Sequence, residues 1–267
     1  MPTLETIEIR TLSGYARAIA AEPDELKWFR GVSSSTHRLV PSLYRHPTIG
    51  VSAQLLGLEA SLITRFRERA QPMVSRALPV DRLELMFLMQ HHGMPTRLLD
   101  WSENAFVALF FALCDLRRDA TGTTTGSSCV WRLKPVLWNR TVHAHINYSG
   151  EPFSVGDSRL TNGYVQVGDG ATLMDRPVAV YGVHNSPRIV SQRGVFTLFG
   201  RSMDPMEDVF TAGAFEDGTL QKIEINGVHQ ESVFRELLGA GVLDSTVFPD
   251  LDGLARELKR SAGFGAR

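Results

Sequence analysis

The chain has 267 residues, of which 43% are hydrophobic and 21% charged, the composition of an ordinary globular protein that can bury a substantial core. Its formal net charge of -1 at pH 7 excludes a whole-molecule attraction to nucleic acid or anionic lipid, so such binding would need a local basic patch. The two cysteines, Cys114 and Cys129, form no disulfide framework and no zinc motif. Two reduced thiols are favoured, although a single bridge between them stays open.

The N-terminus and the apolar runs predict a cytoplasmic protein without a membrane partner. The first twenty residues carry acidic side chains early and contain no apolar stretch long enough for a signal peptide. The most apolar run, from Ala105 to Leu113, is much shorter than the roughly 20 residues that a membrane-spanning helix needs.

The first part of the chain is predicted to be rich in helices. Apolar residues recur at helical spacing, and Gly93 suits a helix C-terminus while Pro95 prevents continuation. In chain order we expect a short strand or turn and then a helix over 7–20, a strand ending in a turn over 26–31, a helix over 52–70, a helix from about 80 to 93 and a short extended segment over 96–101.

The run from Ala105 to Leu113 is apolar nearly all round and predicts a buried helix, with Ser102 as its expected N-cap. From Cys129 onward the pattern is mostly that of strands. The expected strands are 130–133, 178–181, 195–199 and 220–225, and the expected helices are 230–238 and 251–259. Helices first and mostly antiparallel strands later predict an α+β fold in a single domain over residues 1–267.

The first candidate for chemistry is the segment Trp28-Phe29-Arg30-Gly31. An arginine at the end of a strand offers a fixed guanidinium fork, which suits a diphosphate or a carboxylate. The glycine after it lets the backbone approach a ligand closely. A surface ion pair of Arg30 is the alternative.

The second candidate is the junction from Gln90 to Trp101, which places two histidines, an arginine, an aspartate and a tryptophan between two apolar segments. Polar groups held by rigid elements are often functional. A structural alternative stays open, in which a histidine caps the helix, Arg97 pairs with Asp100 and Trp101 is core. No further set of ligands follows at metal spacing, so we expect no metal.

Two further segments carry polar side chains. In the segment from His184 to Thr197, Gln192 and Thr197 could hydrogen-bond a ligand, or the segment is a hairpin corner with exposed polar residues. The pair His143-x-His145 would share one face of a strand, but two ligands do not make a metal site, and a structural role is favoured.

Together these segments resemble the FRG domain family. The similar segments are Phe29-Arg30-Gly31, residues 90–102 with 108–112 after them, residues 192–197 and residues 248–254, so the resemblance spans about 26–258. It implies a bacterial or phage protein, in some cases beside defence or toxin modules.

The order of these motifs is similar to that in ADP-ribosyltransferases, which implies NAD as substrate, a split sheet and a macromolecular acceptor. In that superfamily a first strand ends in Arg or His, a second supplies a polar motif, and a third opens with Glu. The resemblance places catalytic roles on Arg30, Asp100, Gln192 and Glu224, and binding roles on Phe29, Gly31, His92, Thr96, Arg97, Trp101 and Thr197.

The chain departs from that pattern because the uncharged Gln192 stands where the glutamate is expected. Asp100 and Glu224 are the possible substitutes. Two alternatives without catalysis stay open: a polar network that only stabilises the core, and a module that binds a nucleotide, a nucleic acid or a protein. A basic face would favour the module, and its residues are Arg65, Arg67 and Arg69 with Arg76 and Arg82.

Overall fold

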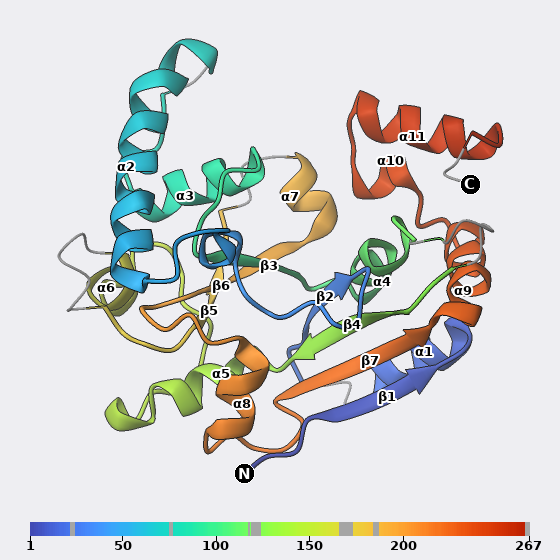
Figure 1. The fold of residues 1–267 in the computed structure, drawn as a ribbon, viewed down its shortest axis with the longest axis horizontal. Coiled ribbons are helices and arrows are strands. Elements are labelled where there is room, and N and C mark those ends of the chain that lie inside the picture. The colour runs from blue at the N-terminus through green and yellow to red at the C-terminus, as the bar shows by residue number, and fades with distance from the viewer. Residues whose placement is uncertain are drawn as a thin grey trace.

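The structure, a computed structural model, describes residues 1–21, 25–74, 77–116, 118, 124–165, 173–183 and 187–264. Its strands form one seven-stranded sheet in the order β1-β7-β4-β2-β3-β6-β5 (Figure 1). They are β1 (Glu5–Ile9), β2 (Trp28–Val32), β3 (Leu98–Ser102), β4 (Ser127–Leu133), β5 (Val178–Tyr181), β6 (Gly194–Leu198) and β7 (Leu220–Asn226). Only β1 and β7 pair in parallel among the described strands, so the predicted α+β fold with mostly antiparallel strands is confirmed.

Helices surround this sheet. They are α1 (Leu12–Ala20), α2 (Ser52–Ala70), α3 (Arg82–His91), α4 (Ala105–Leu113), α5 (Pro135–Val142), α6 (Ser158–Leu160), α7 (Pro187–Gln192), α8 (Met206–Ala212), α9 (Gly227–Gly239), α10 (Asp244–Val247) and α11 (Leu251–Ser261). No helix in the described part of the chain has both the length and the apolar character needed to cross a membrane.

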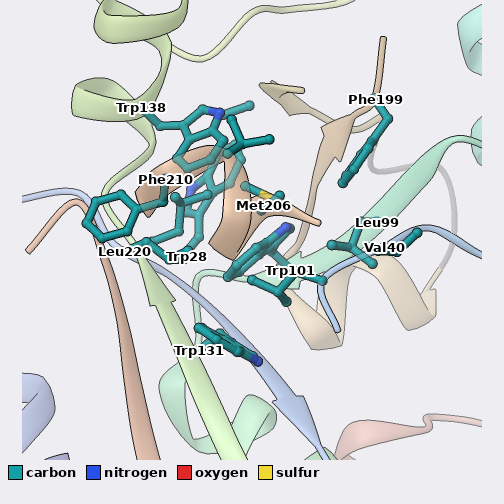
Figure 2. Packing of buried hydrophobic residues seen from close by; sticks show 14 of the residues in the cluster. Trp28, Val40, Leu99, Trp101, Trp131, Trp138, Phe199, Met206, Phe210 and Leu220 are labelled. Atoms are coloured by element: carbon teal, nitrogen blue, oxygen red, sulfur yellow. The ribbon is translucent and has the colours of Figure 1, made fainter. Parts of the chain in front are cut away.

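Both faces of the sheet are buried. Trp28 and Phe29, which follow one another in β2, belong to two different apolar clusters, because successive side chains of a strand point to opposite faces. Figure 2 shows the first cluster, in which Trp28 of β2 lies beside Trp138 of α5 and Phe210 of α8, whereas Trp131 of β4 lies apart from them. The opposite face is covered by α4 and α9 on one half and by α3 on the other.

The sheet opens between β2 and β3. These strands share one register pair, Phe29 with Ser102, whereas β2 and β4 share five, and so do β3 and β6. The residues after Phe29 and those before Ser102 are therefore not joined by a backbone ladder. This fork in the middle of the sheet leaves room for a pocket.

Several sequence predictions need correction. Asn104, and not Ser102, caps α4, because its side chain accepts hydrogen bonds from the backbone N–H groups of Phe106 and Val107. The region after Cys129 also contains the helices α5, α7 and α8, so it is less strand-rich than expected. Part of the segment from His184 to Thr197 lies outside the described residues, and so does Arg76 of the basic face.

Gly31 allows β2 to lie directly against α4. A Cβ atom at this position would lie 1.8 Å from the carbonyl oxygen of Ala108 and 2.7 Å from the backbone nitrogen of Ala112. The backbones of β2 and α4 cannot move apart without a loss of packing. We therefore expect Gly31→Ala to lower the free energy of unfolding by about 3 kcal/mol or more, measured by urea denaturation.

Gly57 of α2 provides the matched control, because a Cβ atom there would meet nothing within 4 Å. Gly57→Ala is expected to leave stability unchanged or to raise it by up to about 1 kcal/mol, since alanine is the better helix former. An unfolding free energy of Gly31→Ala equal to that of the unmodified protein would contradict this close approach of β2 and α4.

Candidate functional site

A pocket of about 410 Å³ lies at the fork between β2 and β3. The elements that line it, β2, β3, α3, α4 and α7, can be followed around the centre of Figure 1. The described polar and aromatic residues on its walls are Phe29, Arg30, Ser33, His37, Phe87, Gln90, His91, Asp100, Trp101, Ser102, Phe111, Arg188, Gln192 and Phe196. The segments around Arg30, Asp100 and Gln192, far apart in the sequence, therefore meet in one cleft.

Arg30 and Asp100 face each other across the open part of the fork. The Arg30 Nη1 atom donates a 2.6 Å hydrogen bond to the carbonyl oxygen of Asp100 and lies 3.9 Å from its Oδ2 atom. The Arg30 side chain is 22% exposed and that of Asp100 54%. Burial lowers the pKa of Arg30, Asp100 opposes this shift and Arg45 adds to it. The guanidinium remains charged at neutral pH, because arginine titrates far above it.

The Asp100 carboxylate is held by Gln90 from the end of α3. Gln90 Nε2 donates a 2.9 Å hydrogen bond to Asp100 Oδ2, and Gln90 Oε1 accepts a 2.6 Å hydrogen bond from the Thr96 hydroxyl. The Thr96 oxygen also accepts from the backbone N–H of Leu98, so its proton is directed to Gln90. Thr96 itself is fully buried and positions Gln90 from behind the pocket.

Gln192 is oriented by a backbone carbonyl. Its Nε2 atom donates a 3.1 Å hydrogen bond to the oxygen of Val247, which leaves Oε1 as an acceptor for a ligand hydroxyl. The Gln192 carbonyl oxygen accepts a 2.6 Å hydrogen bond from the Ser102 hydroxyl at the end of β3. Gln192 ends α7 and does not lie on the strand itself.

Trp101 lies both in the core and on the pocket wall. It is 3% exposed, and its indole N–H donates a 3.1 Å hydrogen bond to the Thr197 hydroxyl. Thr197 is fully buried and does not line the pocket, so it fixes the indole from behind. The structure thus shows the core position that the structural alternative gave Trp101, and the binding role expected of this residue stays a prediction.

Arg97 lies away from the pocket and pairs with a residue other than the expected one. Its guanidinium forms an ion pair with Glu59, with 2.8 Å between Arg97 Nε and Glu59 Oε2, and the two side chains are 2% and 1% exposed. Its other nitrogens donate to the carbonyl oxygens of Phe199 and Tyr164. The structural alternative, in which Arg97 pairs with Asp100, is therefore wrong on this point, since Asp100 pairs with Arg30.

His92 and Glu224 also lie outside the pocket lining. His92 is exposed at the end of α3, and the preceding residue His91 takes the place on the wall. Burial lowers the pKa of His91, and the neighbouring His92 and Arg188 lower it further. Glu224 lies on β7 beside Lys222, with 3.1 Å between Nζ and Oε2, and lines a separate, smaller cavity.

His143 and His145 do not share a strand, contrary to the sequence interpretation. His143 follows α5, is 2% exposed, and neither of its ring nitrogens has a partner among the described residues. The described residues contain no group of three or more potential metal ligands. Burial lowers the pKa of His143 to about 4, and His145 and Arg159 contribute to this shift.

This burial predicts a loss of stability in acid. The unfolded state takes up a proton on His143 near pH 6.5, while the folded state resists protonation down to about pH 4. The free energy of unfolding therefore has its full contribution from His143 above pH 6.5. This contribution falls by about 3 kcal/mol as the pH drops to 4. His143→Phe should lose less unfolding free energy over this interval in urea titrations. If the unmodified protein and His143→Phe lose the same unfolding free energy over this interval, the lowered pKa of His143 is contradicted.

Residues 25–121 match the model of the FRG domain family. This part of the chain is similar to the FRG domain. Searches of curated proteins and of solved structures found no match. The match covers β2, α2, α3, β3 and α4, whereas α7 with Arg188 and Gln192 lies beyond it. The pocket therefore combines walls from the matched segment with one wall from a later segment.

The three residues of the segment Phe29-Arg30-Gly31 have separate tasks. Phe29 packs into the cluster beneath α4 and also lines the pocket. Arg30 directs its guanidinium to Asp100, and Gly31 makes the close contact between β2 and α4 possible.

Sequence reasoning missed Gln90, His91 and Arg188 as members of the site. All three lie inside segments that were singled out for their polar density. The sequence did not show which of His91 and His92 faces the pocket, because this depends on the orientation of α3 about its axis. Arg188 was missed because the short helix α7 was not predicted.

Proposed function

We propose that this protein binds NAD in the pocket and releases nicotinamide from it, as an NAD glycohydrolase or an ADP-ribosyltransferase. The observation that carries the proposal is the convergence of Arg30, Asp100 and Gln192 on one pocket at the fork of the sheet. Its volume of about 410 Å³ lies in the range of small-molecule sites.

The arrangement of strands supports the proposal. β2 and β3 carry the first two motifs, and the third runs from the end of α7 into β6. β2, β3 and β6 lie side by side in the sheet, in the same order as the motifs follow one another along the chain. The opening between β2 and β3 also resembles the split sheet of that superfamily. Because β6 pairs with β3 and β7 with β4, we propose that the functional domain extends past residue 121 to these strands.

The side chains suit the chemistry of nicotinamide release. The bond between the ribose C1′ and nicotinamide breaks, its electron pair leaves with nicotinamide, and positive charge develops on the ribose. Asp100 is the carboxylate among the described lining residues, and it can stabilise that charge. Arg30 suits the diphosphate, and Gln192 Oε1 suits a ribose hydroxyl. The oxygen of water, or of a macromolecular acceptor, then bonds to C1′ and gives up its proton.

The test is incubation of the purified full-length chain with NAD, with and without cell extract or RNA, while nicotinamide release is followed by chromatography. Release by the chain alone indicates a glycohydrolase, and release that requires extract or RNA indicates transfer to an acceptor. No release, together with no rise in melting temperature on adding NAD, would reject the proposal in favour of a binding module without catalysis.

The resemblance to proteins found beside defence or toxin modules agrees with this activity, because enzymes that consume NAD or modify macromolecules can arrest a cell. We place the reaction in the cytoplasm, where NAD is available.

The non-catalytic alternative depends on the basic face of α2. Arg65, Arg67 and Arg69 are exposed there, although Arg67 donates a hydrogen bond to the carbonyl oxygen of Val80. If this face binds nucleic acid, binding should weaken steeply with salt.

A further inference from the structure

The wall formed by α7 brings a second arginine to the pocket. Arg188 and Gln192, one turn apart on α7, both line the pocket, and they face it from a different element than Arg30 of β2. Among the described lining residues the charged ones are thus two arginines and Asp100, which leaves an excess of positive charge. Such a lining favours an anionic ligand.

Arg188 is held by stacking instead of by an ion pair. Its guanidinium carbon lies 4.8 Å from the ring centroid of Phe248. Phe248 is 8% exposed and packs edge-on against Phe110 and Phe111 of α4. Among the described residues no carboxylate pairs with Arg188. A stacked guanidinium keeps its N–H edge available for an anion.

The rest of α7 is fixed to the same segment. Gln192 Nε2 donates a 3.1 Å hydrogen bond to the carbonyl oxygen of Val247, and Ser191 Oγ lies 3.3 Å from the same oxygen. The residues Val247 and Phe248 therefore hold α7 against the pocket, so the position of Arg188 is set before a ligand binds. Such preorganisation lowers the entropic cost of binding.

We propose that Arg188 is a second anion-binding residue of the pocket and that, with Arg30, it holds the diphosphate of a bound dinucleotide. The identity of the ligand rests on the proposed function, whereas the role of Arg188 in binding a diphosphate does not require turnover. A diphosphate has oxygens on two phosphorus atoms, so guanidinium groups on two walls can each bind one of them.

The experiment is calorimetric titration of the full-length chain with inorganic pyrophosphate, ADP-ribose and nicotinamide. Arg188→Gln is expected to weaken pyrophosphate and ADP-ribose binding by about 10- to 100-fold, since hydrogen bonds to a charged group are lost. Nicotinamide carries no negative charge, and its affinity should not change. Arg188→Lys keeps the charge and should recover part of the loss.

Arg256→Gln is the matched control. The Arg256 guanidinium carbon also lies over the Phe248 ring, at 4.9 Å, but Arg256 does not line the pocket. This variant should bind all three probes like the unmodified chain, and circular dichroism should show all variants folded.

Unchanged affinity of Arg188→Gln for pyrophosphate and ADP-ribose would overturn the inference, and so would failure of the unmodified chain to bind either of them. If the unmodified chain releases nicotinamide from NAD and Arg188→Gln has the same KM, the inference fails while the proposed function stands. If pyrophosphate binding depends on Arg188 but no NAD turnover is found, the inference stands and the proposed function fails.

Discussion

Arg97→Met is expected to lower the free energy of unfolding by about 3–5 kcal/mol, because it leaves the Glu59 carboxylate buried without its cation. Glu59 is 1% exposed, and two of its contacts, with the Nε and the backbone N–H of Arg97, come from this one residue. Only the backbone contact survives the substitution. The carbonyl oxygens of Phe199 and Tyr164 also lose their donors. The melting temperature should fall by about 6–20 °C, measured by calorimetry.

The double variant Arg97→Met with Glu59→Met separates the buried charge from the loss of packing. Removing both charges avoids an uncompensated carboxylate, so the double variant should be more stable than Arg97→Met alone. If instead the two substitutions add, the ion pair is not energetically coupled, and our explanation of the buried Arg97 fails.

Elements with a clear apolar period were predicted well. The helices over Ser52–Ala70 and Ala105–Leu113 have the expected bounds, because their apolar positions repeat at helical spacing or fill the whole segment. The helix Pro135–Val142 was missed, since its valines, tryptophan and threonine favour strands when judged locally. The stacking of Trp138 on Phe215 is a long-range packing contact, and single-segment reasoning cannot include it.

The site was predictable in its segments and not in its contacts. Polar density between apolar segments identified the parts of the chain that carry Arg30, Asp100 and Gln192. Their partners were not predictable, because the sequence does not show whether Arg30 or Arg97 pairs with Asp100. Arg97 does not pair with Asp100 because it pairs with Glu59. Glu59 lies 38 residues before Arg97 and accepts a hydrogen bond from its side chain. A contact of that separation leaves no local pattern.

Arg30→Ala is expected to reduce nicotinamide release from NAD at least about 100-fold, because it removes the fixed cation that we propose binds the negatively charged diphosphate. Asp100→Ala should cause a loss of similar size by removing the carboxylate next to the developing positive charge. Both variants should still melt cooperatively, since the Asp100 side chain is 54% exposed and the Arg30 guanidinium lies at an open fork. Steady-state kinetics and calorimetry measure the two properties separately.

Arg45→Ala provides the control for charge alone. Arg45 is near enough to affect the pKa of Arg30, yet it is exposed and does not line the pocket. A long-range field effect would lower turnover in Arg45→Ala as well, whereas direct binding by Arg30 predicts a change of less than about threefold, as expected for a screened surface charge. Arg30→Lys should remain strongly impaired, because a lysine keeps the charge but not the two-pronged geometry of the guanidinium. Full turnover in both Arg30→Ala and Asp100→Ala would remove the pocket from the reaction.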